Sequence, residues 1–119
     1  MVRTQRWLYL LFPLLPVTGC ASSPVPPAKI AAAEGAIDGA RREGAQSLGG
    51  AAGTHLRWAE DQLSVAKTMM KDGDTERAAR VFERSEADAV AAQELARSQR
   101  AKITYDQVRQ QMKSTQKAP

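Results

Sequence analysis

The stretch that decides the fold runs from Thr75 to Met112, TERAARVFERSEADAVAAQELARSQRAKITYDQVRQQM, and contains neither glycine nor proline. A row of small and apolar residues recurs in it at alternating spacings of three and four, the period of one helix face. We expect a single helix about 57 Å long, at 1.5 Å per residue. The residues that this face brings to the core are Ala78, Phe82, Ser85, Ala89, Ala92 and Ala96.

The segment before it, Thr54 to Lys71, has the same period and predicts an antiparallel partner about 27 Å long. Asp72-Gly73-Asp74 separates the two helices, because Gly73 can adopt the left-handed conformation that ends a helix and Asp74 can cap the next one. The first apolar row of this segment is Leu56, Ala59, Leu63, Ala66 and Met70, and a second row is Trp58, Val65 and Met69. Two adjoining rows predict that this helix is the middle one and contacts two neighbours.

An earlier helix is predicted over residues 28–45, where Ile30, Ala33, Ile37, Ala40 and Gly44 share one face. A loop is expected over residues 47–53 (SLGGAAG), with Thr54 as the N-cap of the following helix. The predicted fold is all-α: a three-helix antiparallel hairpin bundle over residues 28–112, with a long third helix and a polar tail over 113–119.

The third helix is too long for its partner to cover. Its uncovered end carries Ile103, Tyr105, Val108 and Met112, which either stay exposed or bury their apolar surface against another chain. Trp58 has two interpretations as well: a core residue packed on the first helix, or an anchor for a partner.

The first nineteen residues have the organisation of a secretion signal. Arg3 and Arg6 precede an apolar run over residues 7–17 (WLYLLFPLLPV), which as a helix would rise about 16 Å, half of a bilayer core. Val17, Thr18, Gly19 and Cys20 follow this run.

These four residues resemble the lipobox of bacterial lipoproteins. The resemblance implies cleavage before Cys20 and a diacylglycerol on its thiol, which with an N-acyl chain holds a protein stably on a membrane. It also implies a place in the bacterial cell envelope, and the lack of aspartate after Cys20 resembles sorting to the outer membrane, facing the periplasm. Residues 20–27, with three prolines, are expected to form an extended tether of about 20 Å.

The charge and composition exclude few functions by themselves. The formal net charge is +4, but without Arg3 and Arg6 only 15 basic residues face 13 acidic ones. No basic cluster is interleaved with aromatic residues, so we expect no nucleic-acid partner. His55 is the only histidine and Cys20 the only cysteine. With His55 expected to be exposed in a first helical turn, neither a metal site nor a Cys/His nucleophile can be assembled.

The chain after its signal resembles domain-of-unknown-function family 4398, found in small envelope lipoproteins. The resemblance covers most of residues 26–105 and implies a location and a fold but no activity. The matching residues are Ala36, Ala40, Gly44, Ala45, Leu56, Ala59, Leu63, Ala66, Met70, the 72–74 turn, Ala78, Ala87, Asp88, Ala89, Ala92 and Ala96.

The hairpin is also similar to one tetratricopeptide unit, through Val65, Ala66, Met69, Ala78 and Phe82. It departs from that pattern at Gln62, Ser85 and Val90. A single unit cannot form the peptide groove that several repeats build, so the similarity implies hairpin packing.

Together these patterns predict a membrane-anchored structural or adaptor protein that is not an enzyme. It is expected to bind an envelope protein or a second copy of itself, without a cofactor, a metal or a small-molecule substrate. A non-catalytic module that binds peptidoglycan is the alternative.

Overall fold

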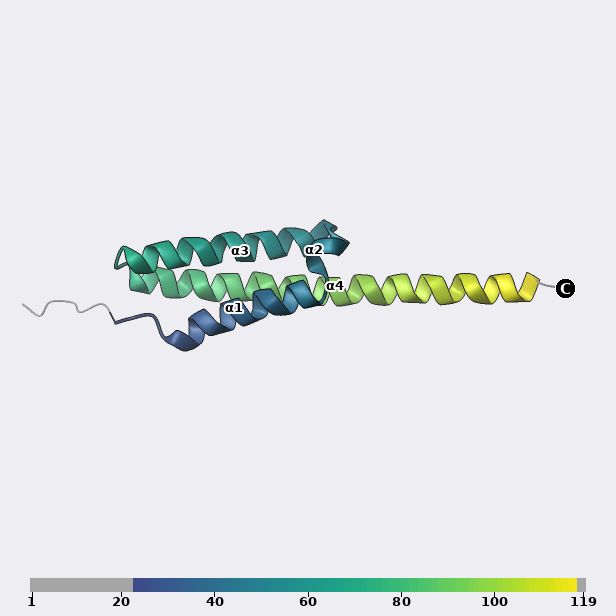
Figure 1. Ribbon diagram of the computed structural model, residues 1–119, viewed down its shortest axis with the longest axis horizontal. Coiled ribbons are helices and arrows are strands. Elements are labelled where there is room, and N and C mark those ends of the chain that lie inside the picture. The colour runs from purple at the N-terminus through teal and green to yellow at the C-terminus, as the bar shows by residue number, and fades with distance from the viewer. Residues whose placement is uncertain (1–22, 118–119) are drawn as a thin grey trace, which may run out of the picture.

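The computed structural model describes residues 23–117, and these form four helices (Figure 1). Their bounds are α1 Pro27–Arg42, α2 Ala45–Leu48, α3 Gly50–Lys71 and α4 Thr75–Lys117. The all-α fold and the long last helix are confirmed. α4 is longer than predicted, because the helix continues through the segment expected to be a polar tail as far as Lys117.

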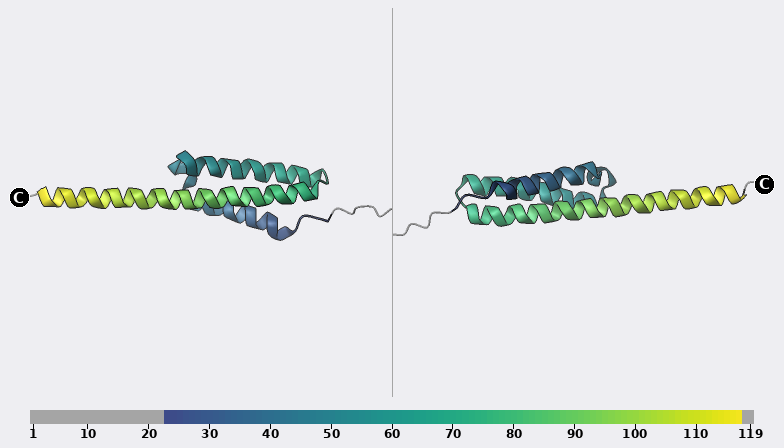
Figure 2. Two further views of the ribbon diagram at one scale, coloured as in Figure 1. Left: turned by 180° about the vertical axis from the view of Figure 1, so that it is seen from behind. Right: turned by 90° about the horizontal axis from the view of Figure 1, so that it is seen from below.

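The helix at the centre of the bundle is α4. α3 and α1 lie along it on two sides, and α1 and α3 share a much narrower contact with each other (Figures 1 and 2). The prediction that the Thr54–Lys71 segment is the middle helix is therefore wrong. Trp58 and Val65 of its second apolar row face outward and are about half exposed, whereas Met69 of that row is partly buried against the Phe82 cluster.

The predicted core face of α4 is confirmed residue by residue. Ala78, Phe82, Ser85, Ala89, Ala92 and Ala96 are all completely buried. Most of the residues that meet them from α1 and α3 are alanines, so the helix axes can approach closely. Phe82 is the largest fully buried side chain, and it packs with Val25, Ala33, Ala66 and Ala78.

The predicted tether is partly docked on this core. Val25 is buried against the Phe82 cluster, and Pro27 already occupies the first turn of α1, where a missing N–H costs nothing. Only the residues before Val25 are left to act as a tether.

The turn between α3 and α4 has the predicted mechanism. Gly73 has a φ of 84°, in the left-handed region, and its N–H donates to the Met70 carbonyl oxygen at 3.3 Å. The Asp74 N–H donates to the Met69 carbonyl oxygen at 2.9 Å, which completes a Schellman motif. Asp74 then caps α4, because its carboxylate accepts from the Arg77 N–H at 3.3 Å.

The predicted loop over residues 47–53 is wrong. The chain instead forms the single turn α2 and then passes through Gly49 (φ 63°) and Gly50 (φ 56°) into α3. These two glycines supply the change of direction, and helical structure resumes four residues before the expected cap. Thr54 is inside α3, where its hydroxyl donates to the Gly50 carbonyl oxygen at 2.9 Å.

Two polar side chains of α4 form hydrogen bonds to the backbones of the neighbouring helices, one to α3 and one to α1. The Ser85 hydroxyl donates to the Ala59 carbonyl oxygen at 2.7 Å, which satisfies the only polar residue fully buried among those described. The Gln93 amide donates to the Ala36 carbonyl oxygen at 2.9 Å, and it lies so close to α1 that a Cβ on Gly39 would be 2.6 Å from its nitrogen. Gly39 thus provides the space in which Gln93 reaches the α1 backbone.

Candidate interaction surfaces

The C-terminal part of α4 extends beyond every other helix of the described chain (Figure 1). The bundle ends where Arg97 and Arg100 pair with Glu43 of the α1–α2 junction, at 3.0 and 3.2 Å. This bonding to Glu43, joined by Glu94, raises the pKa of the Arg97 guanidinium above its usual value. From Ala101 to Lys117 every residue is exposed, and within residues 23–117 none of them bonds to another helix. We call residues 101–117 the overhang; it is about 26 Å long.

The four predicted contact residues are all exposed on the overhang but do not share one face. At 100° per residue, Ile103 lies about 20° from the core row of Ala96, whereas Tyr105 lies about 180° away. Val108 and Met112 lie near Tyr105, at about 120° and 160° from Ala96. The exposed fractions are 42% for Ile103, 65% for Tyr105, 49% for Val108 and 61% for Met112.

The face of Tyr105 continues back along the bundled half of α4. Val90 lies at about 120° from Ala96 and is 46% exposed, and Ala87 lies at about 180° and is also exposed. Glu83 and Glu94 occupy the same side. We call this side, from Glu83 to Thr115, the outer face of α4. The sequence does not predict the bundled half of this face, because Val90 stands out there only as a departure from the tetratricopeptide pattern.

The charges of α4 are segregated along its length. Residues 75–96 contain five acidic and three basic residues, and residues 97–117 contain six basic residues and one acidic residue. Within residues 23–117, none of the three cations Lys102, Arg109 and Lys113 forms an ion pair. They lie in one row at about 220–260° from Ala96, beside the apolar residues of the overhang. The nearly balanced total charge conceals this separation.

Trp58 lies on the outside of α3 with half of its surface exposed, so its interpretation as a core residue is wrong. Its indole contacts the His55 ring edge to face, with centroids 5.0 Å apart and an interplanar angle of 78°. An exposed tryptophan held in this way is available as an anchor.

His55 is not the exposed first-turn residue expected from the sequence. Its Nδ1 lies 2.9 Å from the Asp88 carboxylate, and the Gln62 amide donates to the same carboxylate at 2.7 Å. The cluster ties α3 to α4 through partly buried groups. The Gln62 Oε1 atom is buried without a partner. Over residues 23–117 no group of three or more His, Cys, Asp or Glu side chains is arranged to hold a metal ion.

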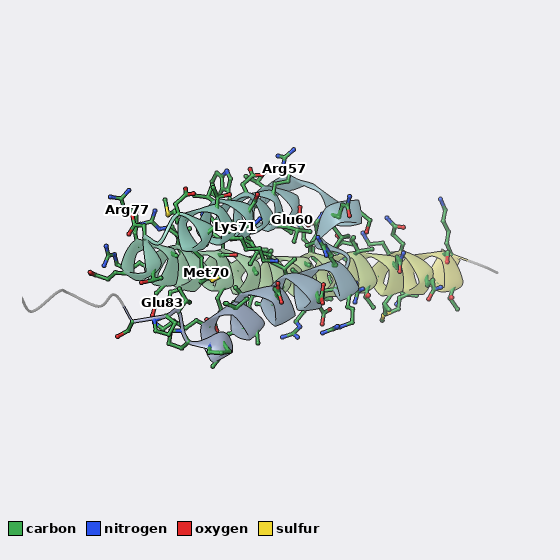
Figure 3. The ribbon with its side chains drawn as sticks, turned by 60° about the vertical axis from the view of Figure 1, so that its left-hand side comes forward. Arg57, Glu60, Met70, Lys71, Arg77 and Glu83 are labelled. Atoms are coloured by element: carbon green, nitrogen blue, oxygen red, sulfur yellow. The ribbon has the colours of Figure 1, made fainter. Side chains whose placement is uncertain are left out.

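A shallow groove of about 290 Å³ lies where Gly49 and Gly50 connect α2 to α3. Arg57 and Glu60 are among the residues that line it, and Figure 3 shows Arg57 reaching outward from α3. Glu60 already accepts hydrogen bonds from Arg41 at 2.7 and 3.0 Å, and this bonding raises the pKa of the Arg41 guanidinium. Within residues 23–117 Arg57 forms no ion pair, so the polar side chains lining the groove are this cation, Gln46 and the already paired Glu60.

The predicted lipid site, Val17, Thr18, Gly19 and Cys20, lies outside the described residues. Within residues 23–117 no helix is both long enough and apolar enough to cross a membrane.

The fold and its surfaces define a small all-helical module with a projecting charged helix. The chain belongs to the family described as Domain of unknown function (DUF4398), whose sequence profile matches residues 28–108. The match ends within the overhang. Comparison with curated proteins and with solved structures found no match. The similarity to a tetratricopeptide unit stays a prediction.

Proposed function

We propose that this chain is a lipid-anchored envelope protein that acts without catalysis, as a structural or adaptor module, by binding a protein through α4. The observation that carries the proposal is the overhang: seventeen helical residues with an apolar row and no covering helix within the described chain. The overhang gains no tertiary packing within the described chain, and most helical stability in proteins comes from such packing, so a partner surface would stabilise it.

The start of α1 and the overhang lie at opposite ends of the molecule, and this arrangement supports the proposal. α1 begins at the end of the bundle where α4 begins, and Lys29 near the start of α1 pairs with Glu83 in the first part of α4. The overhang points away from this end (Figures 1 and 2). A chain held on a membrane through Cys20 would therefore have its overhang far from its attachment point.

The test is crosslinking in living cells with the full-length chain and with a chain that stops after Arg100. Residues 101–117, which the truncation removes, are all exposed, so the bundle and its Glu43 pairs remain. We expect the full-length chain to capture a protein and the truncated chain to lose it. A chain that stops after Ser114 is the matched control and should keep most of the capture. Equal capture by all three chains would refute a role for the overhang.

Anchoring needs a separate test. Replacing Cys20 with Ser should release the protein from the membrane fraction and abolish labelling with a radioactive fatty acid. Retention of both properties in the variant would refute the proposed lipid attachment.

A second function, binding of peptidoglycan, is favoured by one observation. The last 21 residues of α4 carry six cations and one carboxylate, which suits an anionic polymer such as the cell wall. It predicts that the protein sediments with purified cell wall and that salt releases it, because exposed charges are screened. Protein that stays in the supernatant at low salt would exclude this alternative.

A further inference from the structure

We infer that the partner of α4 is an acidic helix of a different protein, which packs along residues 91–112 and places carboxylates against Lys102 and Arg109. The inference rests on the proposed function and names the chemistry of the partner. Three features carry it: the spacing of residues on one side of α4, the charges on that side, and the position of Trp58.

Seven residues of α4 recur at alternating spacings of four and three on the exposed side that adjoins α3. The spacing is held over residues 91–112, about three heptads or 33 Å, and it is the period with which one helix packs along another. All seven residues lie at about 160–260° from Ala96. Six are exposed and one is half-buried, so no helix of the described chain covers them. We call these residues the seam of α4: Ala91, Leu95, Ser98, Lys102, Tyr105, Arg109 and Met112.

The charged residues of the seam are both cations. Lys102 and Arg109 lie seven residues apart, and within residues 23–117 neither forms an ion pair. Apolar seam residues precede and follow each of them, so a helix on the seam would cover the cations together with their apolar neighbours. Charges at such contact positions select a partner helix that carries the opposite charge at the facing positions. The seam therefore fits a helix with Asp or Glu at two positions seven residues apart.

A second copy of α4 does not meet this requirement. Continued toward the start of α4, the same spacing passes through Asp88, Arg84, Val81 and Arg77. Asp88 is the one carboxylate on it over residues 77–112, and His55 and Gln62 already bond to Asp88. A pair of copies would thus bring more cations than carboxylates to its interface, which opposes association.

The positions of the cations also favour a helix over a membrane surface. On a helix that lies in a membrane interface, the cations occupy the polar side, opposite the apolar one. Here Lys102 and Arg109 lie only about 60° and 40° from Tyr105, on the same side of α4. Carboxylates placed between apolar side chains match this alternation, whereas a layer of lipid headgroups does not.

Trp58 adds an apolar contact from α3 at the bundled end of the seam. Its indole contacts the His55 ring at a centroid distance of 5.0 Å, and the His55 Nδ1 lies 2.9 Å from the Asp88 carboxylate. These two contacts hold the half-exposed indole near Asp88, which precedes Ala91 by about one helical turn. A helix on the seam would therefore meet an aromatic anchor at one end and the two cations farther along.

The test is a photoreactive amino acid in place of Tyr105 of the full-length chain in living cells, with Gln107 as the control position. Gln107 lies on the other side of the same helix, about 160° from Tyr105. We expect the probe at Tyr105 to form an adduct with a different protein. Mass spectrometry should identify the crosslinked segment as an amphipathic helix with Asp or Glu at two positions seven residues apart. The probe at Gln107 should give several-fold less of this adduct.

Charge reversal with the same probe tests the pairing itself. K102E/R109E should lower the amount of adduct about tenfold, because two attractions become two repulsions. R57E/K117E is the matched control and should keep the adduct: it changes the net charge equally, at two cations off the seam that form no ion pair within residues 23–117. Replacing the two carboxylates of the partner with lysine should restore the adduct of K102E/R109E.

The results that overturn the inference are distinguishable from failure of the proposed function. Equal adducts from K102E/R109E and R57E/K117E, or a crosslinked segment without the two carboxylates, would overturn the acidic partner and leave the adaptor function standing. An adduct with a second copy would overturn it in favour of self-association, and an adduct with lipid or cell wall alone would overturn binding of a protein by the seam. No protein adduct from either position, with capture also unaffected by truncation after Arg100, would overturn both the inference and the proposed function.

Discussion

Phe82 is the side chain on which the folding of the bundle depends most, and Phe82→Ala tests this directly. It is completely buried, and the other buried residues of its cluster are Val25, Ala33, Ala66 and Ala78, whose short side chains leave a cavity when the ring is removed. Phenylalanine-to-alanine changes at such sites cost about 3–5 kcal/mol. A domain of this size has a free energy of unfolding of about 5–14 kcal/mol, so the variant loses a large share of it.

The assay is thermal unfolding followed by circular dichroism at 222 nm. In a domain of under 100 residues each kcal/mol shifts Tm by about 4–8 °C, so we expect a decrease of about 15–30 °C. Ile103→Ala is the matched control: it removes an apolar side chain from the same helix at an exposed position, and we expect a change within about 0.5 kcal/mol. A decrease of less than about 5 °C for Phe82→Ala, or an equal decrease for Ile103→Ala, would refute the packing described above.

Three further changes test other parts of the structure by the same assay. Ser85→Ala removes the bond to the Ala59 carbonyl oxygen and should cost about 1 kcal/mol; a neutral result would show that the bond contributes nothing. Gly35→Ala should stabilise α1 by about 0.5–1 kcal/mol, because open space surrounds the new Cβ. Gly39→Ala should add little stability, because its Cβ displaces the Gln93 side chain from the Ala36 carbonyl oxygen. Equal stabilisation by the two variants would contradict the close approach of Gln93 to Gly39. Termination after Arg100 should lower Tm by no more than about 3 °C, since residues 101–117 are all exposed and bond to no other helix of the described chain. A larger loss would mean that the overhang supports the bundle.

The parts of the fold that the sequence predicts well are those with a strong local cause. The six core residues of α4 follow from a period without glycine or proline, and the Schellman turn follows from Asp72-Gly73-Asp74. The family follows from the alanine pattern that these helices share.

The failures have physical reasons as well. SLGGAAG has the composition of a loop, but its glycines need positive φ at only two positions, and alanine and Leu48 favour helix on both sides. Two apolar rows on α3 suggested two neighbours, yet α4, whose small residues permit close approach, takes the central place. His55 pairs with Asp88, 33 residues away, which no local pattern indicates.

The interaction surface of α4 could not be predicted from the sequence, because it depends on how the helices are arranged in three dimensions. Ile103, Tyr105, Val108 and Met112 were identified by their position beyond the partner helix, but their division between two faces depends on the direction in which α4 meets the bundle. The outer face depends on the exposure of Val90 on the same side of α4 as Tyr105, which the sequence alone does not indicate. The separation of acidic and basic residues along α4 does not appear in the total charge of the chain, which is nearly balanced.

The central claim is that a protein covers the overhang in the envelope. The most direct measurement is backbone amide hydrogen exchange of residues 101–117 in the full-length protein, in membranes freed of cell wall and in dilute detergent solution. We predict that exchange in the membranes is at least about tenfold slower than in dilute solution, since a free helix end opens readily and a packed one does not. Equally fast exchange in both samples would contradict the claim that α4 binds a protein through this surface.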